Sequence, residues 1–309
     1  MTAKIFIDGE HGTTGLQIRE RLSVRDDIDL LSLAHDERRS LEGRTQLLRE
    51  ADIAILCLPD DAARQSVELA VDAGTRMIDA STAHRTAHDW VFGFAEIEHG
   101  HGEKIARAKY VSNPGCYSTG AIALINPLIK CGLMKSDHPI TINAVSGYSG
   151  GGKGLISQME NEDLDDAISS AFFSYSLDLK HKHIPEIITR CGLDRRPIFT
   201  PSVGRFAQGM LVQIPLFLND LRSGTTREDI HKVLAAHYSD REFVSVVDLA
   251  DSDSIKRLDP EELVGTDAMK LYLFGARDGG EVNLVASLDN LGKGASGAAV
   301  QNLDLMLGG

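Results

Sequence analysis

Cysteine is scarce in this chain, and its spacing excludes the common cysteine-based frameworks. The 309 residues include 4 cysteines, and no two of them form a CxxC pair. A disulfide scaffold needs more cysteines for its length, and a zinc site needs ligands at recognisable spacing. The sequence therefore argues against a secreted disulfide-rich protein and against a structural zinc site.

Long apolar runs and an excess of basic residues are also lacking. No run approaches the roughly 20 apolar residues of a membrane-spanning helix. The first expected strand begins at Lys4, which leaves no room for a signal peptide. The 32 basic residues are outnumbered by 45 acidic ones, so the net charge of -13 repels a nucleic-acid backbone. We therefore expect a cytoplasmic protein that binds neither membranes nor nucleic acids.

The composition and the order of apolar segments predict two domains. The chain is 42% apolar and 25% charged, which is typical of folded globular proteins. In the first third, strands are expected at residues 4–7, 28–34, 53–58 and 77–79, and helices after Gly15 and at residues 62–73. Strands that alternate with helices predict a parallel sheet covered by helices. We expect an α/β, Rossmann-like dinucleotide-binding domain at the N-terminus.

A glycine-rich turn follows the first expected strand. Gly9, Gly12 and Gly15 stand at GxxGxxG spacing between that strand and a helix. In a dinucleotide-binding turn, the first glycine permits the tight bend, the second lets the backbone approach a pyrophosphate, and the third lets the helix pack on the strand. We interpret this turn as the cofactor site. A purely structural turn is the alternative.

The residues after the second strand indicate which dinucleotide binds. An NAD site places an acidic residue there, which accepts hydrogen bonds from the ribose hydroxyls. Here Arg38 and Arg39 offer two guanidinium groups suited to a 2′-phosphate. NADP is therefore the expected cofactor. Asp36 and Glu37 keep NAD open, and a solvated charged loop is the third interpretation.

Cys116 is the candidate nucleophile. It follows a Pro-Gly turn and precedes the apolar helical run at residues 121–125, so we expect it in the first turn of a helix. The unpaired N–H groups of that turn favour a thiolate and lower the pKa of a cysteine placed there. Cys57 ends an apolar run, whereas Cys131 and Cys191 precede glycines as last-turn residues do. A packed core thiol is the alternative for Cys116.

A thiolate that works beside a nicotinamide attacks an acyl or aldehyde carbon, and such a site needs a proton donor or acceptor. His181 and His183 are two residues apart, so their imidazoles point to the same side of an extended segment. Pro185 favours that extended conformation in Ile184. We expect His181 to be the acid/base, with His183 as the alternative and Glu186 orienting one of them. A metal-binding pair is the rival interpretation, although no third ligand stands at recognisable spacing.

Two further segments are candidates for binding an anionic substrate. Residues 146–154, after the expected strand at 140–145, form a glycine-rich loop whose successive N–H groups can cradle an anion beside Lys153. A flexible turn is the alternative. Arg85 follows the fourth strand, at the edge where ligands of open α/β sheets bind. Arg205 is a candidate for holding a carboxylate.

The last third predicts an α+β second domain. A strand is expected at residues 210–218, a helix at 227–238, and a hairpin of strands 270–276 and 282–288. We expect the final helix, which ends near Leu307, to pack on the first domain.

Four motifs in the same order resemble the shorter members of the N-acetyl-gamma-glutamyl-phosphate reductase family, which is related to aspartate-semialdehyde dehydrogenase. They are the nucleophile motif at residues 113–120, the glycine loop at 146–152, the histidine motif at 181–186 and the C-terminal signature at 289–297. The resemblance runs along the whole chain. Ala83 departs from it, because the longer family members often carry an aspartate there.

The resemblance implies a fold, a reaction and an assembly. It implies a dinucleotide-binding domain of residues 1–115 plus 290–309 and a mixed-sheet catalytic and oligomerisation domain of residues 116–289. The implied reaction belongs to arginine biosynthesis. It is the NADPH-dependent reduction of N-acetyl-L-glutamyl 5-phosphate to N-acetyl-L-glutamate 5-semialdehyde and phosphate, through a cysteine thioester and without a metal. The implied assembly is a homodimer or homotetramer.

Together with the resemblance, these residues define the expected site. The catalytic residues are expected to be Cys116, His181, His183 and Glu186. The cofactor contacts are expected to be Gly9, Gly12, Thr13, Thr14, Gly15, Arg38, Arg39, Pro59, Ser81 and Asn290. The substrate contacts are expected to be Arg85, Asn113, Ser146, Gly147, Ser149, Gly150 and Lys153.

Three other functions are open from the sequence. An aspartate-semialdehyde dehydrogenase or another acyl-phosphate reductase would share the thioester chemistry, but the Pro114-Gly115 turn and the histidine motif speak against the former. A catalytically silent NADP-binding regulator would keep the glycine turn and need neither Cys116 nor the histidines. A thiol hydrolase would leave the glycine turn without a role.

Overall fold

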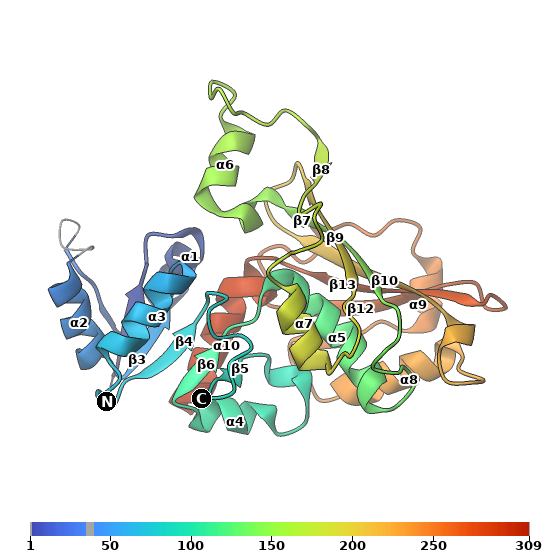
Figure 1. Cartoon of the computed structure of the whole chain (residues 1–309), viewed down its shortest axis with the longest axis horizontal. Coiled ribbons are helices and arrows are strands. Elements are labelled where there is room, and N and C mark those ends of the chain that lie inside the picture. Colours follow the sequence, from blue (N-terminus) through green and yellow to red (C-terminus); the bar gives the residue numbers. More distant parts are fainter. Residues whose placement is uncertain (1, 35–39, 309) are drawn as a thin grey trace. The chain divides into compact units, whose positions relative to one another are not determined.

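The computed structural model describes residues 2–34 and 40–308, which divide into two compact units (Figure 1). Unit 1 holds the described residues of Met1–Ala95, His99–Gly115 and Ala295–Gly309. Unit 2 holds Glu96–Glu98 and Cys116–Gly294. Each unit is built on a sheet of its own.

A parallel sheet forms the centre of unit 1. Within the described residues, its six strands follow the order β2 (Ile28–Leu31), β1 (Ala3–Asp8), β3 (Ile53–Leu56), β4 (Arg76–Asp79), β6 (Tyr110–Ser112) and β5 (Val91–Phe92). The chain passes from β1 to β2 on one side and then crosses to β3 on the other. Ligands of open α/β sheets bind at the carboxyl ends of strands where the order reverses in this way. This is the predicted Rossmann-like arrangement.

Helices cover both faces of this sheet, because its strands alternate apolar side chains between the faces. The helices of unit 1 are α1 (Thr13–Leu22), α2 (Leu41–Glu50), α3 (Asp60–Leu69), α4 (His101–Arg107) and α10 (Gly297–Leu307). Ile5 and Ile7 of β1 pack in one apolar cluster with side chains of α1, α4 and α10. Phe6 packs in a second cluster with side chains of α2 and α3. The C-terminal helix is therefore part of unit 1.

β2 and α3 depart most from the bounds predicted for unit 1, and α1 begins at Thr13 although it was expected after Gly15. β2 ends at Leu31 instead of residue 34, because its pairing with β1 ends there. α3 was expected at residues 62–73, but Asp60 and Asp61 lie in its first turn, where acidic side chains favour a helix start.

A mixed sheet forms the centre of unit 2. Within the described residues, its seven strands follow the order β11 (Val244–Val246), β12 (Met269–Phe274), β13 (Glu281–Leu288), β10 (Met210–Phe217), β7 (Thr141–Gly147), β9 (Ile198–Gly204) and β8 (Phe172–Ser174). β12 and β13 form the predicted antiparallel hairpin, whereas β7 and β9 pair in parallel. Unit 2 is therefore the predicted α+β domain.

A buried helix of unit 2 carries the candidate nucleophile. The helices of this unit are α5 (Cys116–Lys130), α6 (Gly152–Glu160), α7 (Ile184–Cys191), α8 (Arg227–Tyr238) and α9 (Leu249–Ser254). α5, α7 and α8 lie on the same side of the sheet (Figure 1), and α5 contacts β10, β13, α7 and α8. Gly120 permits this close packing, since a Cβ there would lie 2.9 Å from Val212 Cγ2. Burial along α5 fixes the helix end at which Cys116 lies.

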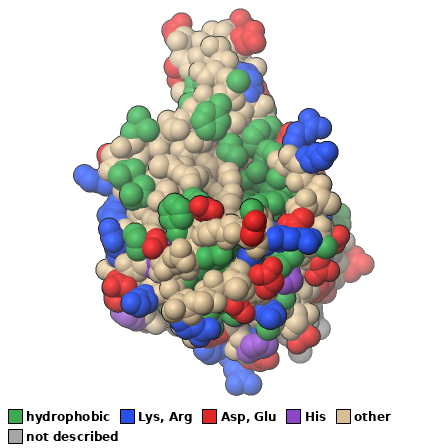
Figure 2. Space-filling view, turned by 90° about the vertical axis from the view of Figure 1, so that its right-hand side faces the viewer, with side chains coloured by type: hydrophobic (Ala, Val, Ile, Leu, Met, Phe, Trp, Pro, Cys, Tyr) green, Lys and Arg blue, Asp and Glu red, His purple; other side chains and the backbone are tan. Residues whose placement is uncertain are grey.

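α6 and β8 belong to a lobe that projects from the sheet of unit 2 (Figure 1). Figure 2 shows this lobe at the top with acidic side chains at its tip. Glu162, Asp163 and Asp165, which follow α6 in the chain, are exposed. Arg205 holds the lobe, because its guanidinium donates to backbone carbonyls at Met159, Ile168 and Ser170. The guanidinium that we considered for a substrate carboxylate is therefore engaged by the protein itself.

Short helical turns complete the described chain. They are η1 (Ala95–Ile97), η2 (Tyr148–Gly151), η3 (Leu218–Asp220) and the π-helical turn η4 (Gly292–Ser296). Among the helices described, none combines the length and the apolar character that crossing a membrane requires.

Candidate active site

Cys116 lines a cavity of unit 2. It is the first residue of α5, and its side chain is half-buried. The cavity has a volume of about 360 Å³, and Ser146, Gly150, Tyr175 and His181 also line it. The thiol thus stands at a helix N-terminus and is accessible to a ligand, which are two conditions for a reactive cysteine.

The other cysteines lack this combination. Burial raises the pKa of Cys57 to about 12 and also raises the pKa of Cys191. Cys131 is exposed, but it follows the C-terminal end of α5, where a helix disfavours negative charge. Cys116 is therefore the cysteine whose surroundings suit a thiolate nucleophile.

A glycine of the C-terminal signature packs directly against Cys116. A Cβ at Gly294 would lie 2.8 Å from the Cys116 Cβ and 3.1 Å from the Asp289 carbonyl oxygen. Gly294 belongs to η4, in which the buried Lys293 forms an ion pair of 2.7 Å with the buried Glu96. The signature therefore positions the nucleophile, a role that the sequence pattern alone did not indicate.

His181 is held at both ring nitrogens. Its Nδ1 accepts a hydrogen bond of 3.1 Å from the backbone N–H of His183, and its Nε2 lies 3.2 Å from the Tyr175 hydroxyl. A ring nitrogen that accepts an N–H carries no proton of its own, so the hydrogen-bond pattern assigns the proton of the neutral imidazole to Nε2. That proton is on the ring nitrogen beside Tyr175, another residue of the cavity wall.

Tyr175 is a site residue that the sequence analysis missed. Burial raises its pKa to about 12, so its hydroxyl stays protonated near neutral pH. The His181 ring packs edge-on against two tyrosine rings. Its centroid is 5.6 Å from that of Tyr175 and 5.8 Å from that of Tyr117. The only sequence signal for Tyr175 is its place shortly before the histidine motif.

His183 and Glu186 lie at the start of α7, which corrects the predicted backbone of this motif. Ile184 was expected to be extended, but it is the first residue of α7, and Pro185 lies in the first turn, where the N–H that proline lacks has no helical partner. His183 is the N-cap, its ring centroid is 4.7 Å from that of His181, and Glu186 is buried in the first turn. A turn brings the imidazoles together. Within the described part of the chain, no group of three or more His, Cys, Asp or Glu side chains could hold a metal ion.

The glycine loop is anchored along its first half. The backbone N–H groups of Gly147, Tyr148 and Ser149 donate to carbonyl oxygens of residues 206–209. These N–H groups are therefore not available to cradle an anion. The loop then enters η2 and α6, so the unpaired N–H groups of a helix start belong to the residues that follow Gly151, including the exposed Lys153.

Two asparagines expected to contact ligands have hydrogen bonds within their own units. In unit 2, Asn290 donates to the Ser149 hydroxyl at 2.9 Å and accepts from the Gly209 N–H at 2.8 Å. It therefore ties the glycine loop to the start of β10. In unit 1, the Asn113 Oδ1 accepts from Asn302 at 3.0 Å.

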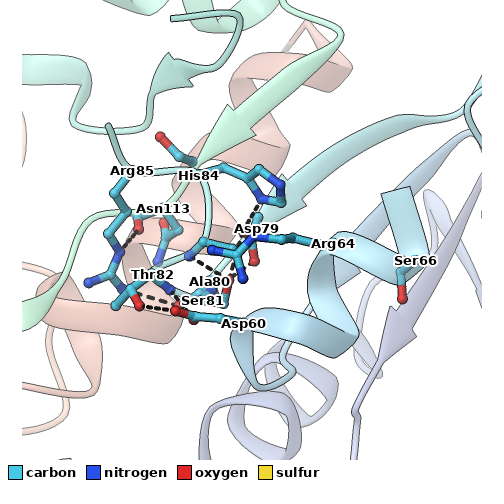
Figure 3. A network of polar contacts seen from close by, with 12 residues as sticks. Asp60, Arg64, Ser66, Asp79, Ala80, Ser81, Thr82, His84, Arg85 and Asn113 are labelled. Carbon is cyan, nitrogen blue, oxygen red and sulfur yellow. Dashed lines mark hydrogen bonds and ion pairs between the residues drawn. The ribbon is translucent and has the colours of Figure 1, made fainter. Parts of the chain in front are cut away.

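A polar network surrounds the carboxyl end of β4 in unit 1 (Figure 3). Asp79 accepts hydrogen bonds of 2.8 Å from the Ser81 N–H and hydroxyl, and its carboxylate lies 2.6 Å from Nδ1 of His84. Arg85 is buried and donates to the Asn113 carbonyl oxygen at 2.9 Å. The side chains of Ser81 and Arg85 thus stabilise the loop after β4.

The turn after β1 has a shape that suits a dinucleotide. Gly9 has a φ of +94°, and a Cβ there would lie 2.3 Å from a carbonyl oxygen just beyond β3. A Cβ at Gly15 would lie 2.4 Å from the Gly9 carbonyl oxygen. Gly12 is the N-cap of α1, whose first residues are Thr13 and Thr14, so the helix start faces this turn. Such a helix start is a binding site for phosphate groups.

Two buried acidic residues, Asp8 and Glu10, flank Gly9 in the turn after β1, and the sequence analysis did not single them out. Asp8 ends β1, is buried and forms an ion pair of 3.0 Å with Arg44. Glu10 is buried in the turn and accepts hydrogen bonds from Arg19 at 2.6 Å and from the Ser32 hydroxyl at 3.2 Å. A GxxGxxG pattern specifies glycines only, so it could not indicate these contacts.

The remaining cofactor contacts expected from the sequence divide into two groups. Pro59 is the N-cap of α3, just after β3, and so lies at the carboxyl edge of the sheet. Arg38 and Arg39, which we expected to bind a 2′-phosphate, lie outside the described residues. A preference for NADP over NAD stays a prediction.

Family models and full-length relatives match the chain. The model described as semialdehyde dehydrogenase, NAD binding domain, matches residues 4–106, and the one described as semialdehyde dehydrogenase, dimerisation domain, matches residues 116–290. Proteins named N-acetyl-gamma-glutamyl-phosphate reductase from Brucella ovis and Brucella canis are each 58% identical to it over 309 residues, which is 100% of either chain.

Solved structures of aspartate semialdehyde dehydrogenases share the fold. The enzyme II from Vibrio cholerae, complexed with ASA, has a TM-score of 0.75 at 15% identity, covering 99% of this chain and 98% of that chain. The Candida albicans enzyme with NADP has a TM-score of 0.67 at 15% identity, covering 99% of both chains. The predicted fold class is thereby confirmed.

Proposed function

Because the chain belongs to the semialdehyde dehydrogenase family, and within it to the N-acetyl-gamma-glutamyl-phosphate reductases, we propose that it is a reductase of arginine biosynthesis. Its proposed reaction is the reduction of N-acetyl-L-glutamyl 5-phosphate by NADPH to N-acetyl-L-glutamate 5-semialdehyde and phosphate. The observation that carries this proposal is that Cys116 and His181 line one cavity. Acyl-phosphate reduction needs a nucleophile that captures the acyl group and a hydrogen-bond donor for its oxygen. These two side chains can supply both.

Covalent capture begins at the Cys116 sulfur. The thiolate adds to the acyl carbon, the carbon–oxygen bond to phosphate breaks, and phosphate leaves with the electron pair of that bond. Cys116 then holds the acyl group as a thioester. The Nε2–H of His181 donates to the acyl oxygen, where negative charge develops as the carbon becomes tetrahedral.

The glycine turn after β1 and the start of α1 would hold the nicotinamide cofactor, which would supply the hydride for reduction of the thioester carbon to the aldehyde. Cleavage of the carbon–sulfur bond returns the electron pair to Cys116 and frees the aldehyde. His181 holds the oxygen during this cleavage. The proton consumed in the overall reaction ends on the released phosphate.

The glycine turn supports a dinucleotide, and the sequence supports NADP. Gly9 and Gly15 let the turn close tightly, because a Cβ at either position would clash with backbone oxygens. The N–H groups of Thr13 and Thr14 at the start of α1 suit a pyrophosphate. Arg38 and Arg39 are the proposed partners of a 2′-phosphate. No metal takes part in the proposed chemistry.

The substrate phosphate is assigned to the start of α6. Gly150 lines the Cys116 cavity, and Lys153 follows in the first turn of α6. A helix start and an ammonium group both favour a phosphate dianion. Ser146 and Gly147, which also line the cavity, are proposed to contact the acyl chain.

We also propose that the protein is a cytoplasmic homodimer or homotetramer that associates through unit 2. The description of the family model for residues 116–290 as a dimerisation domain supports this assembly. Free cysteines, as found at all four positions, are typical of a reducing compartment.

The proposed function is tested by running the reaction from the aldehyde side. We expect the protein to reduce NADP with N-acetylglutamate 5-semialdehyde only when inorganic phosphate is present, because the thioester needs phosphate as its acceptor. NADPH absorbance measures the rate. Aspartate semialdehyde is expected not to replace the acetylated compound. Equal turnover without phosphate would contradict acyl-phosphate chemistry, and a preference for aspartate semialdehyde would point to the related enzyme.

Gly294→Ala is expected to lower kcat about 10- to 100-fold, because a misplacement of the nucleophile by about 1 Å has an effect of this size. The added Cβ would lie 2.8 Å from the Cys116 Cβ, so the cysteine must move. The measurement is steady-state kinetics, with thermal unfolding to verify the fold. Gly74→Ala is the control, since no atom lies within 4 Å of a Cβ there. Wild-type kcat in a folded Gly294→Ala variant would show that Gly294 does not position Cys116.

A further inference from the structure

The Cys116 cavity has an apolar wall and a lysine that take no part in the chemistry above. The wall consists of Leu155 from α6, Phe173 from β8 and Val203 from β9, and the lysine is Lys182. Among the described residues that line this cavity, none is acidic. The cavity therefore offers an apolar surface and positive charge but no partner for a bound cation.

The pairing of β8 with β9 builds the apolar wall. Phe173 and Val203 are direct cross-strand partners, so their side chains lie on the same face of the sheet. Tyr175, the hydrogen-bond partner of His181, is two residues after Phe173 and lines the same cavity. Leu155 joins the wall from α6, where its Cδ2 lies so close to Gly151 that a Cβ there would be 2.3 Å away. The wall is thus continuous with the side of the cavity that holds His181.

Lys182 is available for an anionic ligand. It lies between the two histidines of the motif, its side chain is exposed, and its ammonium forms no ion pair with any described residue. Arg205 donates instead to backbone carbonyls of the lobe. Lys182 is consequently the cavity residue best suited to a carboxylate.

We propose that two subsites of this cavity recognise the N-acetylated substrate: Lys182 binds its α-carboxylate, and Leu155, Phe173 and Val203 contact the methyl of its N-acetyl group. The inference rests on the proposed function, which fixes the acyl carbon at Cys116. A free α-ammonium would enter a cavity that has no carboxylate and would meet the charge of Lys182. An unpaired charge that leaves water is costly, and like charges add repulsion. Acetylation makes the nitrogen neutral, and its methyl group then suits the apolar wall.

Lys182→Met tests the carboxylate subsite. We expect the KM for N-acetylglutamate 5-semialdehyde to rise about 10- to 100-fold, the range of a charge-assisted hydrogen bond, while kcat changes little. The α-carboxamide analogue of this substrate should show a similar loss with the wild-type enzyme and little further loss with the variant. Lys180→Met is the control, because Lys180 is an exposed lysine that does not line the cavity. An unchanged KM together with a retained preference for the carboxylate would overturn this assignment.

Leu155→Ala tests the acyl subsite by changing its size. The wild-type enzyme is expected to prefer the N-acetyl over the N-butanoyl substrate, and the variant to shift that ratio about tenfold or more toward N-butanoyl, as expected for added apolar space. Leu177→Ala is the control, since Leu177 is 80% exposed and does not line the cavity. Leu155→Val is a milder variant if alanine destabilises the fold. The same acyl-length ratio in the variants and the wild type would overturn the apolar subsite.

The wild-type enzyme separates this inference from the proposed function. Phosphate-dependent turnover with unchanged selectivity in the Lys182 and Leu155 variants would overturn the subsites and leave the function intact. Absence of phosphate-dependent turnover in the wild-type enzyme would overturn both.

Discussion

Cys116→Ala is expected to lower phosphate-dependent turnover by at least about 10³-fold, the loss typical of removing a nucleophile from a covalent mechanism. Without the sulfur no thioester forms, so the acyl group is never held for reduction. NADPH binding is expected to persist, because the glycine turn that we assign to the cofactor belongs to unit 1 and Cys116 to unit 2. The measurements are NADP reduction for the activity and NADPH fluorescence titration for the binding.

Cys131→Ala is the matched control for Cys116→Ala. Cys131 is an exposed cysteine just beyond the opposite end of α5, so its loss should leave the rate unchanged. Iodoacetamide at neutral pH should inactivate the wild-type enzyme by labelling Cys116. Cys57 and Cys191 should stay unlabelled, because burial raises the pKa of each. If Cys116→Ala retained the wild-type rate, the thioester mechanism would be excluded, and a nucleotide-binding protein without this chemistry would be the better description.

His181→Asn is expected to lower kcat by about 10²- to 10⁴-fold, the usual contribution of a positioned acid or base. The backbone N–H of His183 holds Nδ1 of His181 as an acceptor, so Nε2 is the nitrogen that carries the proton beside the cavity. Asparagine is shorter, so its amide does not reach the position of Nε2, and the hydrogen bond to the developing oxyanion is lost. The KM for the aldehyde should change little.

His183→Asn provides the decisive comparison with His181→Asn. The ring of His183 is 4.7 Å from that of His181, but His183 is the N-cap of α7 and does not line the Cys116 cavity. Its replacement should therefore lower kcat much less. His231→Asn controls for the loss of an imidazole. His231 is on α8, its Nε2 lies 3.2 Å from the carbonyl oxygen of Val247, and it does not line the Cys116 cavity. A larger loss with His183→Asn than with His181→Asn would reverse the two roles.

Local patterns predicted the elements whose conformation depends on neighbouring residues in the sequence. A Pro-Gly turn before an apolar run put Cys116 at the start of a helix, and α5 begins at that residue. Gly9 has a positive φ in the turn after β1, whereas Gly12 is the N-cap of α1 and Gly15 lies in its first turn. A glycine pair after Asp278 separates the strands of the predicted hairpin. In each case the steric preference of glycine or proline acts within a few residues.

Other parts of the site depend on contacts that no local pattern records. Tyr175 meets His181 because a turn brings them together, and Gly294 meets Cys116 although the two are far apart in the sequence. Residues Glu96–Glu98 belong to unit 2, where the Glu96 carboxylate pairs with Lys293, although the residues before and after them belong to unit 1. The histidine motif shows the same limit. Pro185 is compatible with both an extended residue before it and a helix start, and packing of α7 on α5 selected the helix.

The amino-acid sequence by itself determined the alternation of strands and helices, the glycine turn and the helix start at Cys116, because these follow from steric and hydrogen-bonding preferences over a few residues. The tertiary structure decided which side chains share the cavity with Cys116, which tautomer His181 adopts, and that arginines such as Arg85 and Arg205 bond backbone carbonyls. Apart from the hydrogen bond that sets the His181 tautomer, these contacts join residues separated by many positions. They form only when burial of apolar side chains brings the elements together.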